Sequence, residues 1–165
     1  MSWKMNFIHL TNSLSRYTKD KILFVGLGND TRGDDLAGIF FTNLLKTKSA
    51  FKESNFIIAG KNPENYLGEI TNLKPEAVVF ADAANWGGVP GEISLIESEK
   101  ISDIDFSTHA YSIKLVEKFL LLNNRMDFYY IGIQTKSTEL CKEMSSEVMS
   151  AIKNFFNEDG KAEER

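Results

Sequence analysis

The chain has 165 residues, of which 42% are apolar and 25% are charged. A chain of this size fits one domain, which can bury roughly 70% of the surface that the unfolded chain exposes. The formal net charge is −4, and the 19 Lys and Arg residues are scattered rather than gathered into a stripe. There is thus no basic field for a polyanion, and nucleic acid is not an expected partner.

The chain also lacks the usual signals of export or membrane insertion. Its single cysteine, Cys141, cannot form an internal disulfide, and no stretch approaches the ~20 apolar residues of a membrane span. Polar residues from Asn6 to Asn12 interrupt any apolar signal core. We therefore expect a protein of the reducing cytoplasm that does not insert into a membrane.

Residues 1–20 mix polar positions with scattered large apolar side chains, as in either a short amphipathic helix packed on the domain or a loose arm. We favour the packed helix. These residues are interpreted as an N-terminal extension of one domain at 21–157. The charged tail at 158–165 is expected to be disordered.

From Lys21 onward, short β-type runs alternate with helical patterns, which predicts a parallel sheet with crossover helices. The run 92–97 follows the third strand after too few residues for a crossover, so it is predicted to be an antiparallel edge strand. The fold class is thus α/β: a single-domain, twisted, mostly parallel five-stranded sheet with helices on both faces. The predicted strands are 22–26, 56–59, 77–81, 92–97 and 128–133.

Apolar residues at helical spacing predict four helices between and after these strands. For the third, Ser107 or Thr108 is available as the N-cap. The residues predicted to share a buried face are Leu36, Ile39, Phe40 and Leu44; Tyr66, Leu67, Ile70 and Leu73; Ile113, Val116, Phe119 and Leu120; and Val148, Ile152, Phe155 and Phe156.

The pair Asp34-Asp35 puts negative charge where an α/β protein usually binds phosphate. Thr31 stands where the dinucleotide pattern G-x-G-x-x-G needs its last glycine, so that pattern fails. Gly28 and Gly33 have the spacing of a P-loop, but the two aspartates occupy the places of its Lys and Ser/Thr and would repel a phosphate. What remains is a tight turn that delivers two carboxylates to a helix N-terminus, as caps or as ligands of a cation.

Two further residues could join this pair. Asp82 directly follows the predicted third strand, and His109 begins the third long helix. Carboxyl ends of strands and starts of the following helices face one crevice in an open α/β sheet, so all these side chains could converge there. Carboxylates with an imidazole suit a borderline divalent transition metal better than Mg²⁺.

Other common site types are missing from the sequence. There is no H-E-x-x-H, no G-x-S-x-G and no Cys/His cluster. Cys141 is interpreted as a half-buried filler rather than a nucleophile. His9 has no carboxylate near it in the sequence, and we assign it no role.

Six short motifs, taken together and in this order, resemble the hydrogenase maturation endopeptidases. The resemblance covers about residues 21–157, and it is closest to the branch that serves hydrogenase 3. The motifs are Gly26-Leu27-Gly28-Asn29 with Asp34-Asp35, Pro63-Glu64-Asn65, Ala81-Asp82-Ala83, Pro90-Gly91-Glu92-Ile93, Ser107-Thr108-His109, and Gly132-Ile133-Gln134.

This resemblance implies an endopeptidase that removes a C-terminal peptide from the nickel-loaded large-subunit precursor of a nickel–iron hydrogenase. Nickel would be presented by the substrate, although other divalent metals could occupy the site. The implied nickel contacts are Asp35, Asp82 and His109, and the enzyme is expected to be a monomer. Asp35 and Asp82 are also catalytic candidates, because the attacking water could be activated by the metal or by either aspartate as general base.

Two other functions stay open at this point. One is a metal-dependent hydrolase or phosphorylase of small molecules, for which Arg32 and Lys61 are the available phosphate- or sugar-binding groups. The other is a non-catalytic chaperone that binds the precursor or nickel without cutting it.

Overall fold

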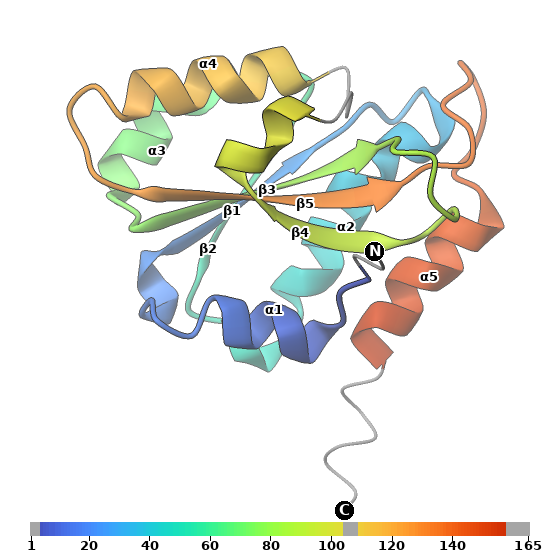
Figure 1. Ribbon diagram of the computed structural model, residues 1–165, viewed down its shortest axis with the longest axis horizontal. Coiled ribbons are helices and arrows are strands. Elements are labelled where there is room, and N and C mark those ends of the chain that lie inside the picture. Colours follow the sequence, from blue (N-terminus) through green and yellow to red (C-terminus); the bar gives the residue numbers. More distant parts are fainter. Residues whose placement is uncertain (1–3, 104–108, 158–165) are drawn as a thin grey trace, which may run out of the picture.

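A five-stranded sheet forms the centre of the computed structural model, which describes residues 4–103 and 109–157 (Figure 1). The strand order is β2-β1-β3-β5-β4, and only β4 runs antiparallel to its neighbour. The strands are β1 (Ile22–Leu27), β2 (Asn55–Gly60), β3 (Ala77–Ala84), β4 (Ile93–Glu97) and β5 (Asp127–Gln134). The predicted α/β class, the five strands and the antiparallel edge strand are all confirmed.

Strand β3 is longer than predicted, which changes the setting of Asp82. Its ladder with β5 continues from Ala77 as far as the Ala84–Gln134 pair. Asp82 therefore lies inside β3 instead of following it. Because side chains alternate along a strand, Asp82 points to the same face of the sheet as Phe80.

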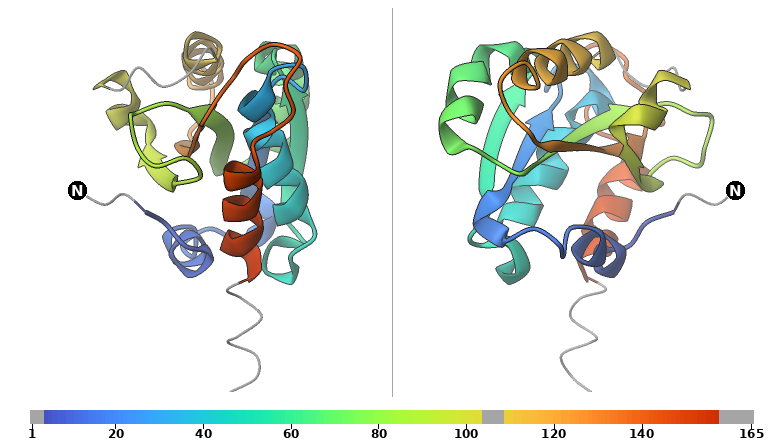
Figure 2. Two further views of the ribbon diagram at one scale, coloured as in Figure 1. Left: turned by 90° about the vertical axis from the view of Figure 1, so that its right-hand side faces the viewer. Right: turned by 60° about the vertical axis from the view of Figure 1, so that its left-hand side comes forward.

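Helices cover both faces of the sheet (Figures 1 and 2). Helices α1 (Phe7–Ser13), α2 (Ala37–Lys46) and α5 (Ser146–Asn157) pack on one face, together with Val79 and Ala81 of β3. Helices α3 (Leu67–Leu73) and α4 (Ala110–Leu120) pack on the other, with Val78 and Phe80. The alternation along β3 thus separates two apolar cores. Short 3₁₀ turns include η2 (Gly33–Leu36), η4 (Pro63–Tyr66) and η5 (Ser98–Asp103).

The predicted buried face of α5 is confirmed, but the one predicted for α2 is shifted. Ala37, Phe41 and Leu45 are buried, whereas the predicted face is only half-buried. The reason is Gly38: a Cβ there would lie 2.3 Å from the carbonyl oxygen of Ala81, so only glycine lets the helix come this close to the sheet. The close approach of α2 to β3 at Gly38 therefore determines which residues of the helix face the core.

Helix α4 also departs from the prediction. Ile113, Val116 and Leu120 are buried as expected, but Phe119 is 52% exposed and Glu117 is buried in its place. The helix begins after His109, which has no side-chain cap hydrogen bond. The predicted caps at 107 and 108, like the tail at 158–165, lie outside the described residues.

The N-terminal segment is a packed helix and not a loose arm. Leu10 and Leu14 of this segment have no exposed surface, and Phe7 contacts Phe51 and Phe155 edge-on, with ring centroids 6.1 Å apart in each pair. The side chain of Asn6 accepts a hydrogen bond from the amide of His9, which caps α1. Within the described residues, no helix has the length and apolar character needed to span a membrane.

We predict that Leu10→Ala lowers the free energy of unfolding by about 2–5 kcal/mol, because it leaves a cavity in the core beneath α1. The neighbouring Ile8→Ala, at a side chain that is 53% exposed, should change it by less than about 0.5 kcal/mol. Urea denaturation of both variants measures the difference. Equal stabilities would mean that α1 is not part of the folded core.

Candidate metal centre

Asp35, Asp82 and His109 meet at one end of the sheet. Each offers a ligand atom, these atoms lie within 4.8 Å of one another, and all three residues are buried. Asp35 follows β1 and Asp82 lies near the end of β3, which are neighbouring strands. The chain leaves β1 for β2 on one side and returns to β3 on the other. The three residues therefore occupy the crevice at the point where the strand order reverses, a usual ligand site of this fold class.

A tight turn after β1 positions Asp35. The carbonyl oxygen of Asp35 accepts a hydrogen bond from the amide of Asn29 at 3.2 Å, and its own amide donates to Arg32 at 3.0 Å. Gly28 lies against this turn with φ +155°, and a Cβ there would be 2.3 Å from the Asp35 carbonyl oxygen. Only glycine fits at this position, and it allows Asp35 to lie close to the sheet.

Asp82 and His109 form a buried pair. The imidazole Nδ1 lies 3.2 Å from each carboxylate oxygen of Asp82. The hydroxyl of Tyr130, on the neighbouring β5, lies 3.4 Å from Oδ2 of the same carboxylate. Asp82 has no exposed surface and His109 is 6% exposed. A carboxylate this deeply buried requires such partners, because leaving it unpaired would carry a large desolvation penalty.

The close approach of these groups shifts two pKa values. Burial raises the pKa of Asp35 above its ordinary 3.8, opposed by the positive charge of His109 and reinforced by the negative charge of Asp82. Burial by itself lowers the pKa of His109, but the hydrogen bond and charge of Asp82, with the charge of Asp35, outweigh it and raise that pKa above 6.5. The site therefore holds protons more tightly than the unfolded chain does.

The geometry suits a divalent transition metal. Two ligands bound at about 2.1 Å from one ion can be at most about 4.2 Å apart, so the 4.8 Å spread needs only a small side-chain movement. Two carboxylates and one imidazole fit ions such as nickel or zinc, and three protein ligands leave a position for a group from outside. Binding would require His109 to lose its second proton.

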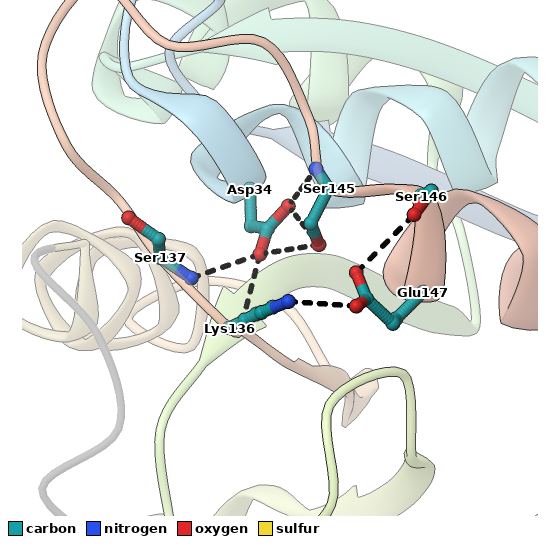
Figure 3. Close-up of polar contacts among 6 residues, drawn as sticks. All are labelled: Asp34, Lys136, Ser137, Ser145, Ser146 and Glu147. Atoms are coloured by element: carbon teal, nitrogen blue, oxygen red, sulfur yellow. Dashed lines mark hydrogen bonds and ion pairs between the residues drawn. The ribbon is translucent and has the colours of Figure 1, made fainter.

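Asp34 does not join this group, although the sequence placed it beside Asp35. Its carboxylate turns toward the loop between β5 and α5 (Figure 3). It accepts hydrogen bonds from the amides of Lys136 (2.8 Å), Ser137 (3.0 Å) and Ser145 (2.7 Å), and from the Ser145 hydroxyl at 2.9 Å. Asp34 has no exposed surface. The two adjacent aspartates thus have separate tasks, and Asp34 joins two loops.

Backbone hydrogen bonds reinforce this junction. The amide of Asp34 donates to Ser137, that of Gly33 to Lys142, and that of Cys141 to Thr31. The prediction that Cys141 is a half-buried filler is wrong, since this residue is exposed and has φ +61°. Its backbone takes part in the junction while its side chain faces solvent.

Sequence reasoning gave no individual role to three residues near the centre. Tyr130 could have been found from the alternation of β5, which directs it to the same face as Asp82. Gln134 accepts hydrogen bonds from the amides of Trp86 and Gly88, and so holds the loop after β3. Glu64 adds negative charge near His109, and its Oε2 is buried with no hydrogen-bond partner among the described residues. Gln134 and Glu64 both belong to the motifs that resemble those of the hydrogenase maturation endopeptidases.

Comparison with known proteins identifies the class of enzyme. A family model described as hydrogenase maturation protease matches residues 40–158, a range that includes Asp82 and His109 but begins after Asp35. The chain belongs to the hydrogenase maturation protease family, and it is accordingly a hydrolase of the peptidase class.

Individual relatives agree with this assignment. The chain is 28% identical to a putative hydrogenase maturation protease of Methanocaldococcus jannaschii, over 73% of this chain and 76% of the relative. It is 26% identical to the hydrogenase 3 maturation protease of Escherichia coli, over 79% and 83%. The crystal structure of the [NiFe] hydrogenase maturation protease HycI from Thermococcus kodakarensis superposes with a TM-score of 0.76 at 30% identity, covering 92% of this chain and 96% of that one.

We predict that Asp34→Asn lowers the free energy of unfolding by about 2–4 kcal/mol, because an amide accepts through one oxygen only and its NH₂ group faces backbone donors. Glu147→Gln breaks the exposed ion pair of Glu147 with Lys136 beside the same loop, and it should have little effect. Chemical denaturation of the two variants tests this. A similar small loss in both would contradict the assigned role of Asp34.

We also predict that, in the metal-free protein, Asp35 and His109 contribute stability at low pH that is lost as the pH rises above their ordinary pKa values of 3.8 and 6.5. Asp35 and His109 have raised pKa values when folded, so the folded state binds more protons, and its advantage disappears as pH passes through those values. His109→Gln should flatten this part of the curve. Thermal melting at a series of pH values, with chelator present, measures the slope. Identical slopes in wild type and variant would refute the prediction.

Proposed function

We propose that this protein removes the C-terminal peptide from the nickel-loaded large-subunit precursor of a nickel–iron hydrogenase. The observation that carries the proposal is the buried group of Asp35, Asp82 and His109, within a chain of the hydrogenase maturation protease family. Nickel would be part of the substrate in this reaction. The three side chains would contact it only when a loaded precursor docks, so an empty precursor would offer no anchor.

The side chains supply the chemistry for this task. Carboxylate and imidazole ligands are suited to borderline ions, and three ligands leave other coordination positions to the precursor's own groups. Asp82 is oriented by His109 and Tyr130, whereas the backbone of Asp35 is held by hydrogen bonds within the turn that carries it. The raised pKa of Asp35 brings its proton exchange closer to neutral pH, which supports it as an acid or base toward the attacking water.

Family membership favours this function over the two alternatives. A small-molecule hydrolase would need Arg32 and Lys61 as anion-binding groups, but both are exposed on separate loops. A non-catalytic chaperone would not account for membership in a family of proteases. The similarity to the hydrogenase 3 maturation protease of Escherichia coli supports the hydrogenase 3 branch. We infer action in the cytoplasm and as a monomer.

We expect that Asp35→Asn, Asp82→Asn and His109→Gln each reduce trimming of a nickel-loaded precursor at least about 100-fold, because each removes a proposed nickel contact or proton-transfer group. Asp30→Asn is the matched control, since Asp30 is an exposed aspartate in the same loop as Asp35. The assay incubates purified protein with nickel-loaded and nickel-free precursor and follows the mass of the large subunit.

Wild-type protein should trim only the loaded form. Normal trimming by all three site variants would refute the proposed site. Absence of trimming by the wild-type protein, with the precursor still bound, would favour the chaperone alternative.

A further inference from the structure

Helix α4 is apolar on two sides, although only one side contacts the sheet. Its inner side buries Ile113, Val116 and Leu120. Its outer side carries four exposed apolar residues, which we call the outer stripe: Tyr111 (80% exposed), Leu115 (48%), Phe119 (52%) and Leu122 (70%), the last in the turn that follows the helix. Their spacing of four, four and three residues places them in one row.

The outer stripe is a concentration of apolar surface and not a sample of a generally apolar exterior. Nine large apolar residues are exposed in the described part of the chain, and five of these lie between 111 and 122. Single exposed apolar side chains are common, but a row of them on one helix indicates an interaction surface. In Figure 1 this helix lies at the outside of the molecule, next to α3.

The stripe cannot turn inward, because polar contacts fix the rotation of α4. Glu117 is buried and accepts a hydrogen bond from the hydroxyl of Ser98 at 2.7 Å. Lys114 donates to the carbonyl oxygen of Ser98 at 2.8 Å. Both bonds tie α4 to η5, so Tyr111, Leu115 and Phe119 are held on the solvent side. Solvent exposure is therefore a stable property of the stripe.

The position of the stripe indicates what covers it. Helix α4 begins directly after His109, and Tyr111 follows two residues later. From Tyr111 to Phe119 the stripe runs about 12 Å along the helix, and Leu122 continues it in the following turn. A peptidase of this family must receive a protein substrate, and any protein that reaches Asp35, Asp82 and His109 lies against the first turn of α4. The stripe lies on the side of α4 away from the His109–Asp82 pair, so a partner that contacts both must be large enough to extend around the start of the helix, as the body of a precursor protein is.

We propose that the outer stripe of α4 is an exosite for the body of the hydrogenase large-subunit precursor. This inference rests on the proposed function. The precursor would offer an apolar groove, and the row of Tyr111, Leu115, Phe119 and Leu122 would insert into it as a helix face does in helix-in-groove recognition. Docking there would bring the metal of the precursor toward His109 at the start of the same helix.

The test uses the double variant Leu115→Gln/Phe119→Gln, which keeps good helix formers at both positions. The matched control is Ile8→Gln/Leu140→Gln, which alters two apolar residues of similar exposure elsewhere (53% and 61%). Trimming of nickel-loaded precursor gives KM and kcat. Binding of the same precursor to immobilised protein gives an affinity that does not depend on cleavage. Sedimentation of wild type and variants gives the oligomeric state.

The double variant should raise KM and the precursor Kd about tenfold or more while kcat at saturation stays the same, and the control should change each by less than about twofold. Unchanged KM and Kd would overturn the exosite. A wild-type dimer that the double variant converts to monomer, with precursor binding unchanged, would identify the stripe as a self-association surface instead. If the wild-type protein does not cut, the proposed function fails, and the binding measurement still decides whether the stripe contacts the precursor.

Discussion

The candidate centre depends on one buried carboxylate that is not part of it. Asp34 has no exposed surface. Its hydrogen bonds to the loop between β5 and α5 anchor the turn that contains Asp35. Desolvation of such a charge is costly, and here three backbone amides and a hydroxyl compensate for it. Because η2 is held in this way, the next residue is directed toward β3. The charge of Asp34 is used for structure, which leaves that of Asp35 available for binding.

In the candidate centre, unlike at Asp34, buried charged groups lie close to one another. Asp35 and Asp82 place two carboxylates near one imidazole, and burial raises the pKa of Asp35 while the acids raise that of His109. Because both pKa values are raised, these two groups favour the folded state less as the pH rises toward neutrality. Strained electrostatics of this kind are characteristic of functional sites. A divalent cation would supply the missing positive charge.

Helix α4 connects the centre with the surface. Its first residues follow His109, its inner side completes one of the two apolar cores, and its outer stripe faces solvent. The hydrogen bonds that Ser98 donates to Glu117 and accepts from Lys114 keep these three parts in a fixed arrangement. The same helix therefore carries both the proposed metal ligand and the proposed docking face, and the distance between them is set by helix geometry.

The sequence by itself determined the α/β class, all five strands, the antiparallel edge strand and the buried face of α5. These features depend on short-range patterns, such as the period of two in strands, which can be read over a few residues. The positions of Asp35 after the first strand, Asp82 near the end of the third and His109 at the start of a helix also made their meeting at one sheet edge predictable, because parallel strands place such positions together.

Only the tertiary structure decided the division of work between Asp34 and Asp35, the place of Asp82 inside β3, and the orientations of α2 and α4. Each of these depends on contacts between residues far apart in the chain. Asp34 meets Ser145, Gly38 meets Ala81, and Glu117 meets Ser98. Local periodicity cannot distinguish two neighbouring stripes of an apolar helix, because long-range packing selects the stripe that faces the core.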